Sequence, residues 1–258
     1  MKLTFLAAAL AALLSTAATA ETIKIGVTGG PHAEIMEAVK AEAAKSGLDL
    51  KIVEFSDYIQ PNAALAQGDL DANSYQHQPF LDQQIADRGY KIVSVAKTVV
   101  FPMGIYSKKV KSLADLPNGA QIGIPNDPTN GGRALLLLQN AGVFKLDPSK
   151  GLKSTPLDIV ANPKKVKIVE IEAPQLPRTL DDLSASAINT NYAITAGLTP
   201  SRDAIILDGA DSAYVNVLAV QIKDKDKPWV QKLIAAYHSG AVKAFIDQKY
   251  QKAAIPAW

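Results

Sequence analysis

The sequence predicts an α/β protein in which strands alternate with helices. Residues 22–27 alternate polar and apolar side chains, as a strand does, and residues 32–46 place apolar side chains at helical spacing. A second strand pattern over residues 48–55 completes a strand–helix–strand unit, which implies a parallel sheet with helices on its faces. The chain has 258 residues, of which 48% are hydrophobic, so it can form one large domain or two lobes that each bury a core.

The rest of the chain continues the alternation, without an internal repeat. Gly47 stands where a helix over 32–46 would stop. Further strands are expected at residues 91–95, 104–107, 121–124, 167–172, 187–189, 204–207 and 215–222. Further helices are expected at residues 62–67, 80–88, 131–141, 175–183 and 229–249.

Residues 1–20 have the pattern of a cleavable signal peptide. A positive start at Lys2 precedes an apolar stretch over residues 3–14, and the segment ends in small residues with the pattern Ala18-x-Ala20. The apolar stretch is shorter than the ~20 residues of a membrane-spanning helix. The chain contains no cysteine that could carry a lipid. We therefore expect the mature protein to start at Glu21 and to be a periplasmic protein without a lipid anchor.

Composition argues against several classes of function. The 27 basic and 25 acidic residues nearly balance, and no basic run is denser than residues 108–111, which is unlike a nucleic-acid-binding protein. Without cysteine there are no disulfides or thiolate metal sites, and the three histidines have no ligand-like spacing. We expect no metal and no cofactor.

Enzyme motifs are missing as well. The sequence has neither a G-x-S-x-G nucleophile elbow nor a phosphate-binding loop of the Walker type. Neighbouring Asp181 and Asp182 point about 100 degrees apart on a helix, so they cannot act on one bond. Glu34, Asp57 and Asp127 lie near predicted loops, but nothing pairs with them. We expect a protein that is not an enzyme and has no catalytic residues.

The loop over residues 125–133 is the strongest candidate for ligand binding. It follows a predicted strand, and sheets of this kind bind ligands beyond the carboxyl ends of their strands. Thr129 or Asn130 can cap the next helix, and the pair Gly131-Gly132 would let backbone N–H groups approach an anion. Arg133, one turn inside, suits a carboxylate. A capped helix with a surface arginine explains the same residues equally well.

Several segments together resemble the NlpA/MetQ family of methionine-binding proteins of bacterial ABC importers. The resemblance covers essentially the whole mature chain. The segments are GGPHAEI at residues 29–35, DLDANSYQH at 69–77, PNDPTN at 125–130, RALLLLQ at 133–139, INTNYA at 188–193, YVNV at 214–217 and IPAW at 255–258.

The resemblance implies a type II periplasmic-binding-protein fold, with two α/β lobes around a ligand cleft. The expected division is a signal peptide at residues 1–20, the first lobe at 21–103, the second lobe at 104–216, and a return segment at 217–258 that packs on the first lobe. It also implies a partner, the permease and ATPase complex of an importer at the inner membrane, which collects the loaded protein. We expect the binding protein itself to be a monomer.

Carried over to this sequence, the resemblance implies a set of ligand-binding residues. Arg133 would pair with the ligand carboxylate, while Asn191 and Asn216 would hydrogen-bond its amino and carboxylate groups. Aromatic side chains and a histidine would wall the thioether. The full set is Arg133, Asn130, Asn191, Asn216, Tyr58, Tyr75, His77 and Phe101. Asn189 and Asn191 are expected to project to the same face of an extended segment, with Asn191 as the ligand contact.

Three positions depart from the family pattern. The family usually starts its mature chain with a lipid-carrying cysteine, and it usually has acidic residues where Gly132 and Ser184 stand here. The expected ligand is methionine, as the L- and also the D-isomer. Alternatives left open are another small apolar amino acid, a methionine derivative or a dipeptide, and a sensor or cleft enzyme on the same fold.

Overall fold

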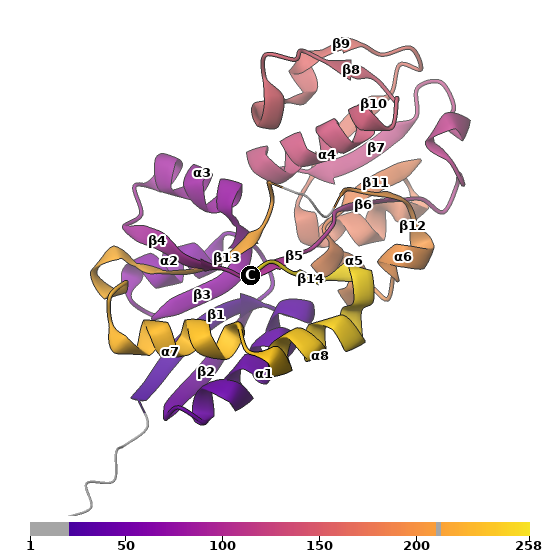
Figure 1. The fold of residues 1–258 in the computed structure, drawn as a ribbon. Coiled ribbons are helices and arrows are strands. Elements are labelled where there is room, and N and C mark those ends of the chain that lie inside the picture. The colour runs from indigo at the N-terminus through magenta and orange to yellow at the C-terminus, as the bar shows by residue number, and fades with distance from the viewer. Residues whose placement is uncertain (1–20, 210–212) are drawn as a thin grey trace, which may run out of the picture.

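Two five-stranded sheets form the cores of two α/β lobes that lie side by side (Figure 1). The structure is a computed structural model, which describes residues 21–209 and 213–258. The predicted signal peptide lies outside the described residues. The sheets have the strand orders β2-β1-β3-β13-β4 and β10-β7-β11-β6-β12, so each sheet mixes strands from distant parts of the sequence.

The first lobe contains both ends of the described chain. Its amino-terminal elements are β1 (Glu21–Thr28), α1 (Pro31–Ala44), β2 (Leu48–Phe55), α2 (Gln60–Gln67), β3 (Ala72–His77), α3 (Gln78–Arg88), β4 (Ile92–Lys97) and β5 (Val99–Val100). Its carboxyl-terminal elements are β13 (Asn216–Gln221), η5 (Ile222–Asp224), α7 (Pro228–Tyr237), α8 (Gly240–Tyr250), η6 (Gln251–Ala253) and β14 (Ile255–Pro256). Helices α7 and α8 pack on α1, and β14 pairs with β5.

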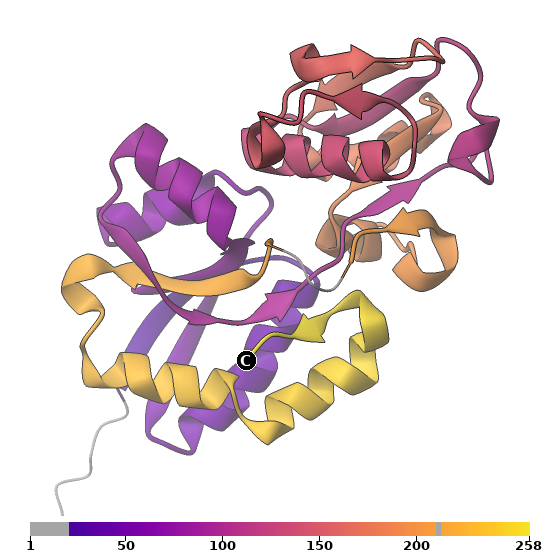
Figure 2. The same ribbon diagram turned by 45° about the horizontal axis from the view of Figure 1, so that its top comes forward.

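The second lobe is inserted between β5 and β13. Its strands are β6 (Gly104–Tyr106), β7 (Gln121–Pro125), β8 (Lys145–Leu146), β9 (Ile159–Ala161), β10 (Lys167–Ile171), β11 (Ala185–Ile188) and β12 (Ala204–Leu207). Its helices are η1 (Leu113–Asp115), α4 (Pro128–Asn140), η2 (Gly151–Lys153), η3 (Pro156–Asp158), η4 (Ala173–Asp181), α5 (Thr190–Thr195) and α6 (Pro200–Asp203). The view in Figure 2 shows the chain passing from the first lobe to the second between β5 and β6.

The residue bounds of the lobes stay a prediction. Asn216, which we assigned to the end of the second lobe, is the first residue of β13 and pairs with His77 in the sheet of the first lobe. Each lobe buries its own apolar core. Ile25, Leu50 and Leu218 are fully buried in the first, and Ile122 and Leu135 are fully buried in the second.

Both sheets are mixed, whereas the opening pattern predicted a parallel sheet. The parallel prediction is confirmed where β1 pairs with β2 and β3. It is wrong for β13, which runs antiparallel between β3 and β4, and for β6, which is antiparallel to β11 and β12. β13 comes from the return of the chain, and an alternation of strands and helices contains no information about such a long-range partner.

Strand β3 and two helical segments also differ from the prediction. β3 was not among the expected strands because Asn73, Ser74 and Gln76 make its sequence polar, yet every residue of it is buried. The helix expected at residues 229–249 is broken at Ser239, whose hydroxyl caps α8 by accepting from the Val242 N–H. The segment expected at 175–183 is the 3₁₀-helix η4, with Pro177 inside it.

We expected the segment around Asn189 and Asn191 to be extended. In the structure it begins a helix instead. Asn189 is the N-cap residue of α5 and Asn191 lies in its first turn. Among the described residues, no helix is both long and apolar enough to cross a bilayer.

Candidate functional site

A cavity lies between the two lobes and is lined by residues of both. It contains about 360 Å³ of space between atoms, part of which is open to solvent. Its lining residues are His32, Tyr58, Tyr75, Gln76, His77, Phe80, Phe101, Asn130, Arg133, Asn189, Thr190, Asn191 and Asn216. All of the side chains proposed as ligand contacts from the sequence therefore lie around one cavity, although their role in binding stays a prediction.

Each lobe supplies its polar side chains from the ends of strands and the first turns of helices. In the first lobe, Tyr75 and His77 come from the end of β3, and Asn216 begins β13 opposite them. In the second lobe, Asn130 and Arg133 lie at the start of α4, and Asn191 at the start of α5. The cavity therefore forms where strand ends and helix starts of both lobes meet.

Asp127 caps helix α4, whereas the sequence suggested Thr129 or Asn130. One carboxylate oxygen of Asp127 accepts from the backbone N–H of Asn130 at 2.9 Å, and both oxygens accept from its side-chain Nδ2. Burial raises the pKa of Asp127, against these hydrogen bonds, which lower it. The helix begins earlier than expected, at Pro128, because proline suits the first helical position. Asp127 thus orients the Asn130 amide, whose Oδ1 bonds to residues across the cavity.

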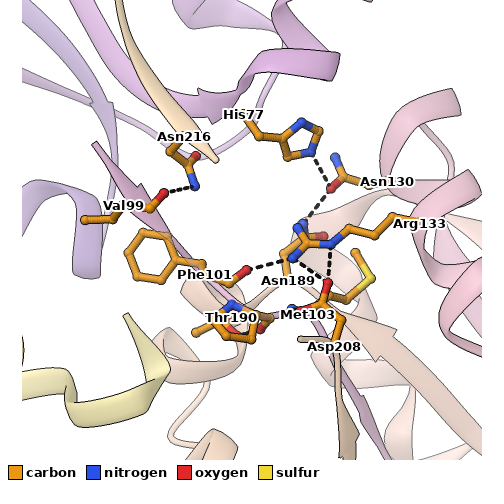
Figure 3. Close-up of polar contacts among 11 residues, drawn as sticks. His77, Val99, Phe101, Met103, Asn130, Arg133, Asn189, Thr190, Asp208 and Asn216 are labelled. Atoms are coloured by element: carbon orange, nitrogen blue, oxygen red, sulfur yellow. Dashed lines mark hydrogen bonds and ion pairs between the residues drawn. The ribbon is translucent and has the colours of Figure 1, made fainter. Parts of the chain in front are cut away.

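The Asn130 side chain bridges the lobes (Figure 3). His77 Nδ1 accepts from the Phe80 N–H and so caps α3, which leaves its proton on Nε2. Nε2 then donates to Asn130 Oδ1 at 3.1 Å, and Asn189 Nδ2 donates to the same oxygen at 2.8 Å. Burial, together with nearby Arg133, lowers the pKa of His77 to about 3, so the ring is neutral at ordinary pH.

Arg133 is buried and already has a charge partner. Its side chain is 4% exposed, and both Nε and Nη2 lie 2.6 Å from Oδ2 of Asp208. Nη2 also donates to the Phe101 carbonyl at 2.9 Å, and the guanidinium stacks 4.5 Å from the ring centre of Tyr214. Burial raises the pKa of Asp208, while Arg133 acts in the opposite direction.

Sequence reasoning missed Asp208, although a signal was present. The residue directly follows β12, a strand that was expected at 204–207. β12 and β11 are both antiparallel to β6, so β12 runs parallel to β11 and its carboxyl end lies at the same edge of the sheet. An acidic residue at that edge was a candidate neighbour for Arg133.

The polar amides at the start of α5 leave one donor and one acceptor unpaired. Asn191 Oδ1 accepts from the Tyr58 hydroxyl at 2.6 Å, across the lobes. Asn191 Nδ2 and Asn189 Oδ1 are buried and have no hydrogen-bond partner among the described residues. Buried polar atoms are almost always paired in native proteins, so such a donor and acceptor on cavity-lining residues indicate a polar ligand. The sequence favoured Asn191 over Asn189 as the ligand contact.

Aromatic rings form the apolar part of the cavity. The Tyr58 ring centre lies 6.1 Å from those of Tyr75 and Phe80, and the Tyr75 hydroxyl donates to the Tyr58 carbonyl. His32 also lines the cavity, with its ring centre 4.8 Å from that of Phe101. Burial lowers the pKa of His32 to about 3, so it too is neutral. These rings suit an apolar or sulfur-containing side chain.

Gly131 and Gly132 do not serve the anion-binding role suggested by the sequence. A Cβ on Gly132 would lie 2.6 Å from the Leu152 carbonyl oxygen, and one on Gly131 would lie 2.9 Å from the Pro125 carbonyl oxygen. The pair allows α4 to pack closely against neighbouring backbone. Neither Gly132 nor Ser184, the two departures from the family pattern, lines the cavity.

The arrangement can bind a small zwitterion with an apolar side chain. Among the residues that the structure describes, Arg133 is the only Lys or Arg that lines the cavity, and no Asp or Glu lines it. Among the described residues, no group of three or more His, Cys, Asp or Glu side chains is placed to hold a metal ion.

Known proteins resemble this chain over nearly its whole length. A family model described as NlpA lipoprotein matches residues 23–258. The D-methionine-binding lipoprotein MetQ of Salmonella typhimurium is 51% identical over 92% of this chain and 88% of its own length. The MetQ protein of Escherichia coli K12 is 48% identical over the same shares.

Solved structures show the same fold. A nutrient binding protein from Burkholderia cenocepacia, solved bound to methionine, is 53% identical with a TM-score of 0.90, over 92% of this chain and 100% of that one. The methionine binding protein MetQ has a TM-score of 0.89 and 48% identity, over 92% of this chain and 98% of that one. The two-lobe α/β fold expected from the sequence is confirmed by these structures.

The comparisons correct the expected localisation. We expected a free periplasmic protein without a lipid anchor, but the matching family and the similar curated proteins are lipoproteins. This finding contradicts the expectation. The expectation depended on the absence of cysteine from the sequence, whereas the family model and the similar curated proteins are described as lipoproteins.

Proposed function

The chain belongs to the NlpA lipoprotein family, and on this premise we propose that its cavity binds methionine for an ABC importer. It is a binding protein of a transporter family and not an enzyme. The observation that supports the ligand most directly is the lining of the cavity. Arg133, whose charge is balanced by Asp208, and the unpaired amide atoms of Asn189 and Asn191 lie beside aromatic rings. This lining matches a zwitterion with a thioether side chain.

The proposed contacts divide the ligand into a polar and an apolar half. Arg133 and the unpaired Nδ2 of Asn191 donate to the carboxylate, because both present N–H groups in the cavity. Asn189 Oδ1 accepts from the ammonium group, and Asn216, held by donating to the Val99 carbonyl, supplies a further polar contact. The apolar half contacts Tyr58, Tyr75 and Phe101, while His77 and Asn130 close the cavity from the two lobes.

The proposed partner is the permease and ATPase complex of the importer at the inner membrane, which would collect a monomeric, closed form. The lobes already touch through Tyr58–Asn191 and His77–Asn130, and Tyr192 donates to the Ser56 carbonyl from the other lobe. A ligand that contacts both lobes stabilises such a closed form over an open one, because its affinity for the two forms differs.

Isothermal titration tests the ligand. The chain from Glu21 to Trp258 is unfolded and refolded to remove carried-over ligand, then titrated with L-methionine, D-methionine, leucine, glutamine and methionine dipeptides. We expect a Kd for methionine below about 1 μM, equivalent to about 8 kcal/mol, which is well within the ligand's size limit. Leucine should bind about a hundredfold more weakly, because it lacks the sulfur contacts. The absence of methionine binding would contradict the proposal.

The transporter role is tested separately with the purified importer. Methionine-loaded protein should stimulate ATP hydrolysis by the reconstituted permease and ATPase complex, while the ligand-stripped protein should not. Binding of methionine without any stimulation would instead favour a soluble sensor on the same fold.

A further inference from the structure

Asp208 neutralises the only arginine that lines the cavity. Its Oδ2 lies 2.6 Å from both Nε and Nη2 of Arg133. Its own position is set by the backbone, because its Oδ1 accepts from the Met103 N–H at 2.8 Å and its N–H donates to the Met103 carbonyl at 2.9 Å. Met103 and Asp208 lie on the two segments that cross between the lobes. The negative charge of Asp208 is therefore held in place by the protein itself and is present before a ligand binds.

Asp208 approaches Arg133 from behind the cavity. It is not a lining residue, and in Figure 3 it lies on the side of the guanidinium opposite His77 and Asn216. The Phe101 carbonyl takes Nη2 and the Tyr214 ring covers one face of the guanidinium. Among the described residues, no acceptor bonds to Nη1 of Arg133. The N–H groups of Nη1 are therefore the ones that can donate to a ligand carboxylate.

The charges of the described residues that line or support the cavity consequently sum to about zero. The cavity-lining histidines, His32 and His77, are neutral because their pKa values are lowered to about 3. Asp127 is a further carboxylate behind Asn130, but the amino-terminal end of α4 and the N–H groups of Asn130 compensate it. Asp57 also acts electrostatically on Tyr75, but it does not line the cavity. Among the described residues, the charged pair that contacts the cavity is Arg133–Asp208, and its charges cancel.

On the basis of the proposed function, we propose that Asp208 restricts the ligand to a net charge of zero. A zwitterionic amino acid adds no net charge to the neutral site. A deaminated acid adds one negative charge, and an amino acid amide adds one positive charge. Because the charges of Arg133 and Asp208 already cancel, the added charge has no free counter-ion in the site. An unpaired charge in a closed site is costly, so both are disfavoured. Asp208 is thus a specificity-determining residue that does not touch the ligand itself.

A ligand series of fixed side chain and varied charge tests this inference. The ligands are methionine, 4-(methylthio)butanoate, which lacks the amino group, and methioninamide, which lacks the carboxylate. The wild-type protein should bind methionine at least about a hundredfold more tightly than either analogue. In Asp208→Asn, Arg133 loses its counter-ion, so the affinity ratio of methionine to the deaminated acid should fall by about tenfold or more.

The ratio of the affinity for methionine to the affinity for the deaminated acid distinguishes an effect of charge from a purely structural effect. If Asp208 only positions Arg133, its substitution weakens both ligands by the same factor, and an unchanged ratio overturns the inference. The matched control is Asp181→Asn, which removes an exposed carboxylate of the same lobe and should leave the ratio at its wild-type value. The wild-type series is a test that needs no variant, since binding of the deaminated acid within about tenfold of methionine also overturns the inference.

Failure of the proposed function gives a different result. A wild-type protein that does not bind methionine contradicts methionine as the ligand, whatever the role of Asp208. The same charge series with leucine and 4-methylpentanoate then tests Asp208 on a second side chain, and a ratio that is unchanged in Asp208→Asn would contradict it there as well.

Discussion

The charge of Arg133 is held in the cavity by a carboxylate, a carbonyl and an aromatic ring. A buried ion pair of this kind adds little net stability by itself, yet removing one partner leaves the other uncompensated. Asp208 is 15% exposed, so most of its surface would stay out of water if Arg133 were absent. Binding and stability are consequently linked at this one side chain.

Arg133→Ala should therefore change both properties. We expect methionine affinity to fall by about a hundredfold or more, because a ligand carboxylate loses its cation. The free energy of unfolding of the empty protein should fall by about 3 kcal/mol, since Asp208 is left unpaired. Calorimetric titration and urea unfolding measure the two effects.

The double variant Arg133→Ala/Asp208→Ala separates them. It should regain most of the lost stability, because no buried charge remains unpaired, but it should not regain affinity. An unfolding free energy of Arg133→Ala equal to that of the wild type would contradict the buried pair.

At the scale of elements, His77 couples helix α3 to the cavity. One ring nitrogen caps α3 and the other donates across the lobes, so the side chain works only as the neutral Nε2–H tautomer. Its pKa is lowered from 6.5 to about 3 in the folded protein, mainly by burial. The unfolded chain takes up the proton first as pH falls. The stabilising contribution is thus complete above about pH 6.5 and is lost progressively toward pH 3.

We predict that the wild-type protein loses stability between pH 7 and pH 5, by about 2 kcal/mol for His77 alone. His77→Asn retains a side chain that can cap α3 but removes the titration, so the loss should be smaller in this variant. It should not vanish, because His32 has a similarly lowered pKa. Thermal unfolding followed by circular dichroism at several pH values measures the difference. The matched control is His238→Asn, which lies outside the cavity. The prediction would be contradicted if His77→Asn and His238→Asn lost equal stability between pH 7 and pH 5.

Close packing of α4 explains why glycine stands at position 132. The Leu152 carbonyl occupies the space that a side chain would need. Gly132→Ala should therefore destabilise the protein by about 1–3 kcal/mol, although alanine is the better helix former. The control is Gly240→Ala in α8, where a Cβ meets nothing within 4 Å. Urea unfolding that ranks the two variants equally would contradict this interpretation of the glycine pair.

At the scale of the whole molecule, side-chain contacts between the lobes hold the cavity closed. Tyr58 of the first lobe donates to Asn191 of the second at 2.6 Å, and Tyr192 donates back to the Ser56 carbonyl at 3.2 Å. Because few such contacts join the lobes, each one affects the balance between open and closed forms.

Tyr58→Phe removes one inter-lobe hydrogen bond and keeps the aromatic wall. We expect methionine affinity to fall by about fivefold to tenfold, equivalent to roughly 1 kcal/mol for one hydrogen bond. Tyr90→Phe, outside the cavity, is the matched control and should bind as the wild type does. Titration calorimetry measures the methionine affinity of both variants. An unchanged affinity in Tyr58→Phe would show that the Tyr58–Asn191 hydrogen bond does not stabilise the closed form.

Much of the fold was predictable because its signals are local. The apolar spacing of single segments predicts β2 and β12 at their observed bounds and places α1 and α3 within a few residues. The same spacing fails for β3, because its polar side chains are buried by partners that lie far away in the sequence. Gln76 and Asn73 both bond to Asn62 of α2, and β3 also pairs with the returning strand β13.

The sequence by itself determined the alternation of elements and the family, and through the family eight of the residues that line the cavity. Only the tertiary structure decided how their charges are paired. Arg133 and Asp208 are 75 positions apart, and Asn130 and Asn189 are 59 apart, so no local pattern connects them. Local periodicity reflects which face of a segment is buried. The charge of a binding site depends on which distant side chains the folded chain brings within hydrogen-bond distance.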